Sequence, residues 1–196
     1  MILAIEEELP LVGDELLLAA NLGPSRRREL AAGRAALRDA LAEVAGVREV
    51  AILADDRGAP VLPAGWVGSI SHKGQRAAAI VAPTGSGFVG VDLEIAAPPR
   101  QPIERRILTP REQSLIAAGT HEVTRVFSIK EAIYKAIDPI VRRYVGFTEV
   151  EVDLRGDGSV AVTVLDVARL PVEVEAWWQE RDGHWLATAR ARARAR

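Results

Sequence analysis

Hydrophobic and polar residues alternate most regularly over residues 87–95. Every second residue on one side of this segment is apolar: Val89, Val91, Leu93 and Ile95. Such alternation is typical of a half-buried strand, whose successive side chains point to opposite faces. The other side ends in Asp92 and Glu94, whose Cβ atoms would lie about 6–7 Å apart and whose charges would repel. The segment therefore predicts either an ordinary solvated strand face or oxygen ligands for a divalent cation.

A hydrophobic period near 3.6 predicts three helices, at about residues 24–44, 109–119 and 122–137. Thr109 and Glu112 have the spacing of a capping box at the start of the second helix. The third helix is expected to stop before Asp138 and Pro139, because the residue before a proline disfavours helical geometry.

Shorter apolar runs between turn residues predict strands at residues 47–53, 67–70, 76–82, 149–154, 160–165, 172–178 and 184–189. A first strand and turn are expected within residues 1–22, and a Ser-His-Lys-Gly turn at residues 71–74. Prolines at residues 98–102 suggest a junction between two lobes, and the final Ala-Arg repeats are expected to fray. The pattern predicts an α+β protein with antiparallel strands.

Composition narrows the functional classes. A chain of 196 residues that is 48% hydrophobic can bury one core, and a net charge of −2 does not favour nucleic-acid binding. The absence of cysteine excludes disulfides, thiolate metal sites and a cysteine nucleophile. No apolar run approaches the ~20 residues that span a bilayer, and the first residues lack the basic flank of a signal peptide. We therefore expect a cytoplasmic monomer that binds neither nucleic acid nor membrane.

Charged residues at the margin of the third predicted helix suggest a site. Lys130 falls within the apolar arc of this helix, where an ammonium is costly unless it reaches water or an anion. Glu131 and Lys135 lie one turn apart at the edge of the arc. They form either an ordinary surface pair or part of a partly closed site for a phosphate and a metal.

The first predicted helix carries an arginine stripe beside its leucines: Arg27, Arg34 and Arg38. These arginines either extend along the core edge to solvent or hold an anion in a cleft. His72 follows a strand and is either a turn residue or a catalytic group. A serine–histidine–acid triad is disfavoured, because Ser71 directly precedes His72 and the chain has no Gly-x-Ser-x-Gly motif. Walker and dinucleotide-binding motifs are also absent.

Three motifs in order resemble the signature of 4′-phosphopantetheinyl transferases of the long surfactin/enterobactin-synthase type. They are Ser-Ile-Ser-His at 69–72, Gly-Val-Asp-Leu-Glu at 90–94, and Phe-Ser-Ile-Lys-Glu-Ala-Ile-Tyr-Lys-Ala at 127–136. Gly-Arg at 33–34 is similar to the N-terminal motif of the family. The resemblance implies two similar α+β lobes, at residues 1–97 and 98–196, with antiparallel sheets packed against helices and the active site between the lobes.

The resemblance also implies transfer of 4′-phosphopantetheine from coenzyme A to a serine of an apo acyl or peptidyl carrier protein, with release of adenosine 3′,5′-bisphosphate. Mg²⁺, or Mn²⁺ in its place, would be held by Asp92, Glu94 and Glu131. Catalysis would fall to Glu131 and Lys135. Coenzyme A contacts would fall on eight residues: Arg26, Arg34, Arg38, Arg57, Ser71, His72, Lys130 and Lys135.

The chain departs from the family pattern at two positions. Ala59 stands where the family often has a lysine, so either Arg57 substitutes for that lysine or the contact is absent, and Phe127 stands where tryptophan is common. Three alternatives stay open: a Mg²⁺-dependent phosphohydrolase acting on a nucleotide or a coenzyme A-like pyrophosphate, a non-catalytic nucleotide-binding module, and a structural protein. The module would have no need of three carboxylates, and the structural protein would leave Lys130 unexplained.

Overall fold

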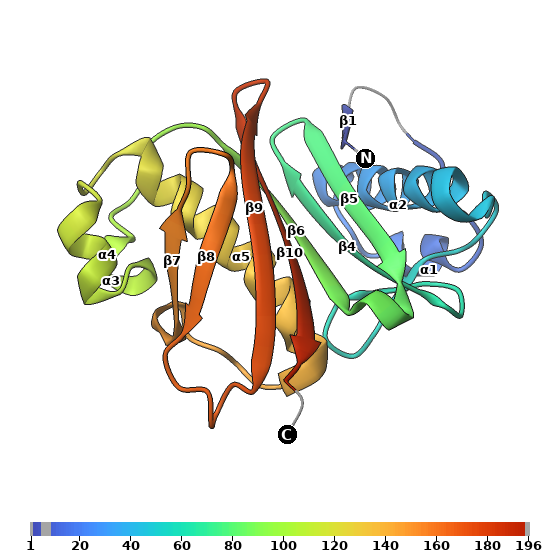
Figure 1. Ribbon diagram of the computed structural model, residues 1–196. Coiled ribbons are helices and arrows are strands. Elements are labelled where there is room, and N and C mark those ends of the chain that lie inside the picture. Colours follow the sequence, from blue (N-terminus) through green and yellow to red (C-terminus); the bar gives the residue numbers. More distant parts are fainter. Residues whose placement is uncertain (1, 5–8, 195–196) are drawn as a thin grey trace. The chain divides into compact units, whose positions relative to one another are not determined.

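The computed structural model describes residues 2–4 and 9–194, and the chain folds into two compact units, Met1–Gly87 (unit 1) and Phe88–Arg196 (unit 2). Each unit contains a long helix and an antiparallel sheet (Figure 1), which confirms the predicted α+β class. No helix within the described ranges combines the length and the apolar character needed to cross a membrane.

Unit 1 is built around one helix and a three-stranded sheet in the order β1-β5-β4. Its elements are β1 (Ile2–Ala4), α1 (Glu15–Ala19), α2 (Pro24–Ala45), β2 (Leu53–Ala54), β3 (Pro60–Val61), β4 (Trp66–Lys73), β5 (Arg76–Pro83) and the 3₁₀ turn η1 (Thr84–Ser86). Helix α2 packs on β4 and β5. A Cβ on Gly33 would stand 2.7 Å from Cγ2 of Ile70, so glycine lets α2 approach β4 closely. This contact accounts for the glycine of the Gly-Arg motif.

Unit 2 is built around α5 and a five-stranded sheet in the order β6-β10-β9-β8-β7. Its elements are β6 (Phe88–Ile95), α3 (Glu104–Ile107), α4 (Pro110–Leu115), α5 (His121–Val141), the 3₁₀ turn η2 (Phe147–Glu149), β7 (Val150–Leu154), β8 (Ser159–Val164), β9 (Val172–Arg181) and β10 (His184–Ala193). Helix α5 contacts β6, β10 and β9, and Figure 1 shows it lying along the sheet.

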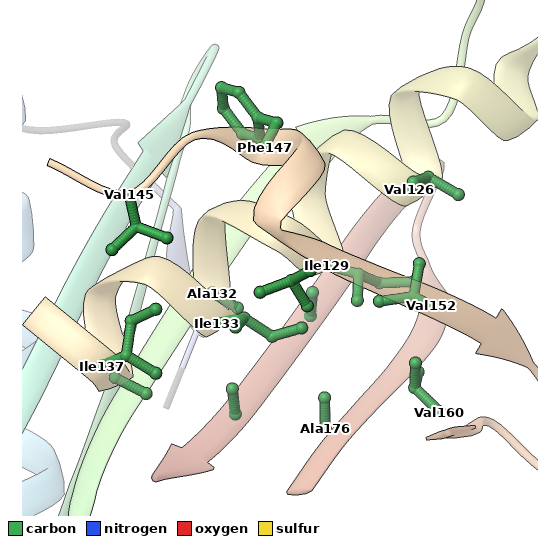
Figure 2. Close-up of a cluster of buried hydrophobic side chains, with 14 of the residues drawn as sticks. Val126, Ile129, Ala132, Ile133, Ile137, Val145, Phe147, Val152, Val160 and Ala176 are labelled. Atoms are coloured by element: carbon green, nitrogen blue, oxygen red, sulfur yellow. The ribbon is translucent and has the colours of Figure 1, made fainter. Parts of the chain in front are cut away.

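The core of unit 2 lies between α5 and the sheet. Figure 2 shows Ile129, Ile133 and Ile137 of α5 in one cluster with Val152 and Ala176 of the strands. Burial of such side chains stabilises each by roughly 1.5–3 kcal/mol relative to an exposed position. This packing fixes which side of α5 faces the sheet, and therefore where the charged residues beside that face point.

Helix α5 lies very close to the sheet at Gly90. A Cβ placed there would stand 1.9 Å from the carbonyl oxygen of Ala132 and 2.8 Å from the amide nitrogen of Ala136. Gly90 lies opposite Ala189 in the β6–β10 register, so small residues cover this part of the sheet. Asp92 is two residues further on and therefore points to the same helix-covered face.

The sequence placed the border between lobes at residues 97 and 98, whereas the structure divides the chain after Gly87. The reason is that β6 pairs along its whole length with β10, which makes it an edge strand of unit 2. The proline-rich segment 98–102 therefore lies inside unit 2. Helix α1 was not predicted. The predicted first strand corresponds to β1 at Ile2–Ala4, and residues 5–8 lie outside the described residues.

Four predicted boundaries were wrong. Strand β2 is much shorter than the strand predicted at 47–53, and α4 ends at Leu115, four residues before the expected end. Helix α5 continues past Pro139 to Val141, since a proline so close to the end removes only one hydrogen bond. The Ala-Arg repeat continues β10 to Ala193, because buried alanines alternate with outward arginines.

We predict that Gly90→Ala destabilises the chain, because the new methyl group would overlap backbone atoms of α5. Overpacking typically lowers the free energy of unfolding by about 1–3 kcal/mol. Because the backbone of α5 cannot easily move away, we expect Gly90→Ala to lose about 3 kcal/mol or more. Urea unfolding measures the change. Gly85→Ala is the matched control, because its Cβ would meet open space, and it should stay within about 0.5 kcal/mol of the parent. Equal unfolding midpoints for the two variants would contradict the prediction.

Candidate active site

A hydrogen bond between Lys135 and Asp92 joins the two predicted site motifs in unit 2. The Lys135 ammonium donates hydrogen bonds to Oδ1 of Asp92, at 2.8 Å, and to the carbonyl oxygen of Val91, at 2.9 Å. Asp92 is buried, whereas the Lys135 side chain is partly exposed. The close approach at Gly90 therefore places the end of Lys135 against β6, with one face open to solvent.

Glu131 lies one helical turn before Lys135, and the acids of β6 influence its pKa. Burial raises the pKa of Glu131 above its ordinary value, and the negative charge of Asp92 raises it further. Glu94 acts in the same direction, while the positive charge of Lys135 opposes the shift. The three predicted metal ligands thus lie close enough together for their charges to interact across the helix–sheet contact.

The influence of these carboxylates on one another does not by itself establish a metal centre. Among the residues that the structure describes, no three histidine, aspartate or glutamate side chains are arranged as a ready site for a metal ion. Lys135 instead takes one oxygen of Asp92. The roles of Asp92, Glu94 and Glu131 as metal ligands consequently stay predictions.

Lys130 does not point toward this group, which corrects its predicted role as a coenzyme A contact. Its side chain is 1% exposed, and Nζ lies 2.6 Å from Oε2 of Glu112. Nζ also donates to the carbonyl oxygens of Ile107, at 2.9 Å, and Phe147, at 3.0 Å. These three acceptors use all three ammonium hydrogens. The anion expected for Lys130 is therefore a carboxylate of the protein.

Glu112 connects Lys130 to the rest of unit 2. Its Oε2 also accepts from the amide of Thr109, at 2.7 Å, and its Oε1 accepts from the amide of Val152, at 2.8 Å. The predicted capping box is present, because Oγ1 of Thr109 in turn accepts from the Glu112 amide. Burial lowers the pKa of Lys130, and Glu112 opposes that shift. The sequence indicated Glu112 as a cap but not as the counter-ion of Lys130.

In unit 1, the inner arginines of α2 are bound to groups of the protein. Arg38 donates to Oε1 of Glu15, at 2.5 Å, and to the carbonyl oxygen of Pro10. Glu15 is fully buried and also accepts from the amide of Ile52. Nε of Arg34 donates to the Ile52 carbonyl oxygen, and burial lowers the pKa of Arg34. Arg38 is thus a structural counter-ion, which argues against its predicted role at coenzyme A.

Arg26 and His72 lie on either side of Glu29 in unit 1. The Arg26 guanidinium is 2.9 Å from Oε2 of Glu29, and Nδ1 of His72 is 3.9 Å from the same oxygen. His72 belongs to strand β4 rather than to the predicted turn, so it and Ser71 point to opposite faces. Arg57 is exposed in a turn that Asp55 stabilises by accepting from its amide. These residues stay predicted coenzyme A contacts.

Comparison with known proteins identifies the family. The model of the N-terminal domain of 4′-phosphopantetheinyl transferases matches residues 14–82, and the model of the 4′-phosphopantetheinyl transferase superfamily matches residues 88–189. The chain belongs to the 4′-phosphopantetheinyl transferase superfamily. The two superfamily matches meet at the border between the two compact units.

Several curated members of the superfamily are similar in sequence. The chain is 35% identical over 151 residues to 4′-phosphopantetheinyl transferase Npt of Nocardia iowensis, covering 74% of this chain and 67% of that protein. It is 31% identical to PptT of Mycobacterium tuberculosis, covering 74% and 66%. Enterobactin synthase component D of Salmonella typhi is 31% identical, with 79% and 62% covered. The matches span about two thirds of each of these relatives.

We predict that Lys130→Met is strongly destabilising, since it leaves the Glu112 carboxylate buried without its counter-charge. Breaking a buried ion pair in this way costs about 3–5 kcal/mol, measured by urea unfolding. Adding Glu112→Gln should recover part of the loss, because the amide keeps an acceptor oxygen without the charge. Parental stability in Lys130→Met would contradict the structural role and return Lys130 to the predicted ligand contacts.

Proposed function

We propose that the chain transfers 4′-phosphopantetheine from coenzyme A to a serine hydroxyl of an apo acyl or peptidyl carrier protein. One observation carries the proposal: Asp92, Glu94 and Glu131 interact beside the Lys135 ammonium within the unit that the superfamily model matches. Carboxylates beside an ammonium are the groups that proton abstraction and phosphate binding require.

The reaction moves one phosphorus atom between two oxygens. The serine oxygen forms a bond to the phosphorus that carries pantetheine, and the phosphoanhydride bond to the adenosine-bearing phosphate breaks. The electron pair of that bond leaves with adenosine 3′,5′-bisphosphate, and the serine proton passes to a base. We assign proton acceptance to Glu131, either directly or through water. The Lys135 ammonium stabilises the charge that develops on the phosphate oxygens.

The donor set also suits a hard divalent cation. Three mutually repelling carboxylates supply the oxygen ligands that Mg²⁺ prefers, and a cation among them would relieve their repulsion. Asp92, Glu94 and Glu131 would hold Mg²⁺ or Mn²⁺. When bound, the ion neutralises charge on the pyrophosphate of coenzyme A.

Intact mass spectrometry of apo carrier proteins incubated with the chain, coenzyme A and Mg²⁺ tests the proposal. We expect a mass increase equal to one phosphopantetheine group on at least one carrier, and none when the acceptor serine is replaced by alanine. The outcome that would sink the proposal is steady release of adenosine 3′,5′-bisphosphate without any carrier, with no mass added to several carriers. That result would favour a phosphohydrolase.

Glu131→Gln should lower the transfer rate by roughly 100-fold or more, which is the usual contribution of a general base. Glu122→Gln is the matched control, because Glu122 lies in the first turn of the same helix and its exposed side chain pairs with Arg125. We expect the control to retain its rate. Undiminished transfer by Glu131→Gln would remove Glu131 from the base role.

Removal of divalent cations with a chelator should abolish transfer, and excess Mg²⁺ or Mn²⁺ should restore it. A direct readout is the electron paramagnetic resonance of Mn²⁺ titrated with the chain and coenzyme A. Asp92→Asn should weaken Mn²⁺ binding by roughly tenfold or more, as loss of one charged ligand implies. Equal Mn²⁺ affinity in Asp92→Asn and Glu122→Gln would rule out Asp92 as a ligand.

A further inference from the structure

After α5 ends, the chain turns back along the helix and passes beside Glu131. Phe127, Glu131 and Tyr134 share one side of α5, since residues three or four positions apart are neighbours on a helix surface. The Phe147 ring packs against both aromatic members of this row, with its centroid 5.7 Å from that of Phe127 and 4.9 Å from that of Tyr134. Those two residues are about 10 Å apart along the helix axis. A ring that contacts both must lie between them, at the level of Glu131.

Tyr144 projects from this returning segment into solvent. Its side chain is 81% exposed, whereas Val145 and Phe147 are buried in the core of unit 2. Figure 2 shows these two buried side chains on the segment that runs back along α5. Tyr144 is three residues before Phe147, so the Cα atoms of the two lie within about 11 Å of each other. An aromatic side chain is thus exposed to solvent near Glu131, the proposed base.

Hydrogen bonds hold the backbone around Tyr144 in place. The Arg143 guanidinium donates to the Tyr144 carbonyl oxygen, at 2.8 Å, and to both carboxylate oxygens of Glu149, at 3.1 and 2.7 Å. Oε1 of Glu149 also accepts from the Gly146 amide, at 2.8 Å. An exposed aromatic side chain on a fixed backbone suits a binding residue, because less conformational entropy is lost when a partner docks.

Two further apolar side chains lie on a segment that is bonded to this one. The amide of Leu165 donates to the carbonyl oxygen of Glu149, the residue that pairs with Arg143. Leu165 and Val167 are both exposed. Two hydrogen-bonded segments of unit 2 thus expose three apolar or aromatic side chains, including Tyr144. Exposed side chains of this kind favour a protein partner over a small polar ligand.

We propose that Tyr144 is a carrier-protein contact, whose ring packs against an apolar surface residue of the carrier while the acceptor serine lies at Glu131; this inference rests on the proposed transferase function. That function requires a folded protein to bring a serine hydroxyl within hydrogen-bond reach of Glu131. Such a partner must contact the enzyme surface around Glu131, and the segment that carries Tyr144 borders that surface. Tyrosine supplies a large, amphipathic contact area with little loss of side-chain freedom.

Isothermal titration calorimetry tests the contact without turnover. The probe is an apo carrier protein that the parent chain modifies, with its acceptor serine replaced by alanine. Tyr144→Ser should weaken binding of this carrier roughly tenfold, as expected for loss of an aromatic anchor at an interface. Tyr144→Phe should stay within about twofold of the parent, because it keeps the ring. Both variants should unfold at the parental urea concentration, since the side chain is exposed.

Trp177→Ser is the matched control. Trp177 is also an exposed aromatic residue of unit 2, but it points away from α5, because its neighbour Ala176 belongs to the helix-covered core. We expect the control to bind the carrier within about twofold of the parent. In transfer assays, Tyr144→Ser should raise the KM for the carrier roughly tenfold. Its kcat and its affinity for coenzyme A should stay within about twofold of the parent.

The outcomes separate this inference from the proposed function. Unchanged carrier affinity in Tyr144→Ser would overturn the Tyr144 contact, and equal losses in Tyr144→Ser and Trp177→Ser would overturn it by showing only a general effect. A tenfold weaker coenzyme A affinity in Tyr144→Ser would overturn it as well, because that result places Tyr144 at the coenzyme. Transfer by the parent chain, read by carrier mass, stands in all three cases. A parent chain that modifies no carrier would overturn both.

Discussion

The candidate site depends on how closely α5 approaches β6. At Gly90 the helix backbone occupies the space in which any other residue would place its side chain. This approach covers the polar face of β6 and brings Lys135 into hydrogen-bond contact with Asp92. A longer separation, enforced by a larger residue, would leave the acids of the strand in solvent and Glu131 apart from them. The glycine is thus a condition for the chemistry, although it carries no functional group.

A second constraint is that the charge of Lys130, buried in the core of unit 2, must be neutralised there. The ion pair between Lys130 and Glu112 satisfies a cation in the core of unit 2 and ties α4, α5 and β7 together. Because all its hydrogens are used, the lysine is not available to a substrate. The cation function of the site therefore passes to Lys135, whose partly exposed ammonium lies against Asp92 of β6.

Much of the architecture could be predicted from short-range patterns. The alternation over β6, the capping box at Thr109 and the long helices appear in the structure nearly where the pattern placed them. The partners of buried charges could not be predicted, because they come from distant positions: Glu112 for Lys130, and Glu15 for Arg38. The wheel of a single helix shows that a charge is buried but not which element supplies its counter-ion. The unit border was misplaced for the same reason, since β6 pairs with the last strand of the chain.

The contrast between Lys130 and Glu131 has a consequence for how α5 can vary. These neighbours differ by about 100° around the helix axis, and one belongs to the core while the other belongs to the candidate site. A one-residue deletion early in α5 would bring the acid into the position of Lys130, toward Glu112, and bury two like charges together. The rotation of α5 about its own axis is therefore fixed, because Lys130 must face the core and Glu131 must face the candidate site. Single substitutions on the exposed side of α5 preserve this rotation, whereas insertions and deletions before Lys130 change it.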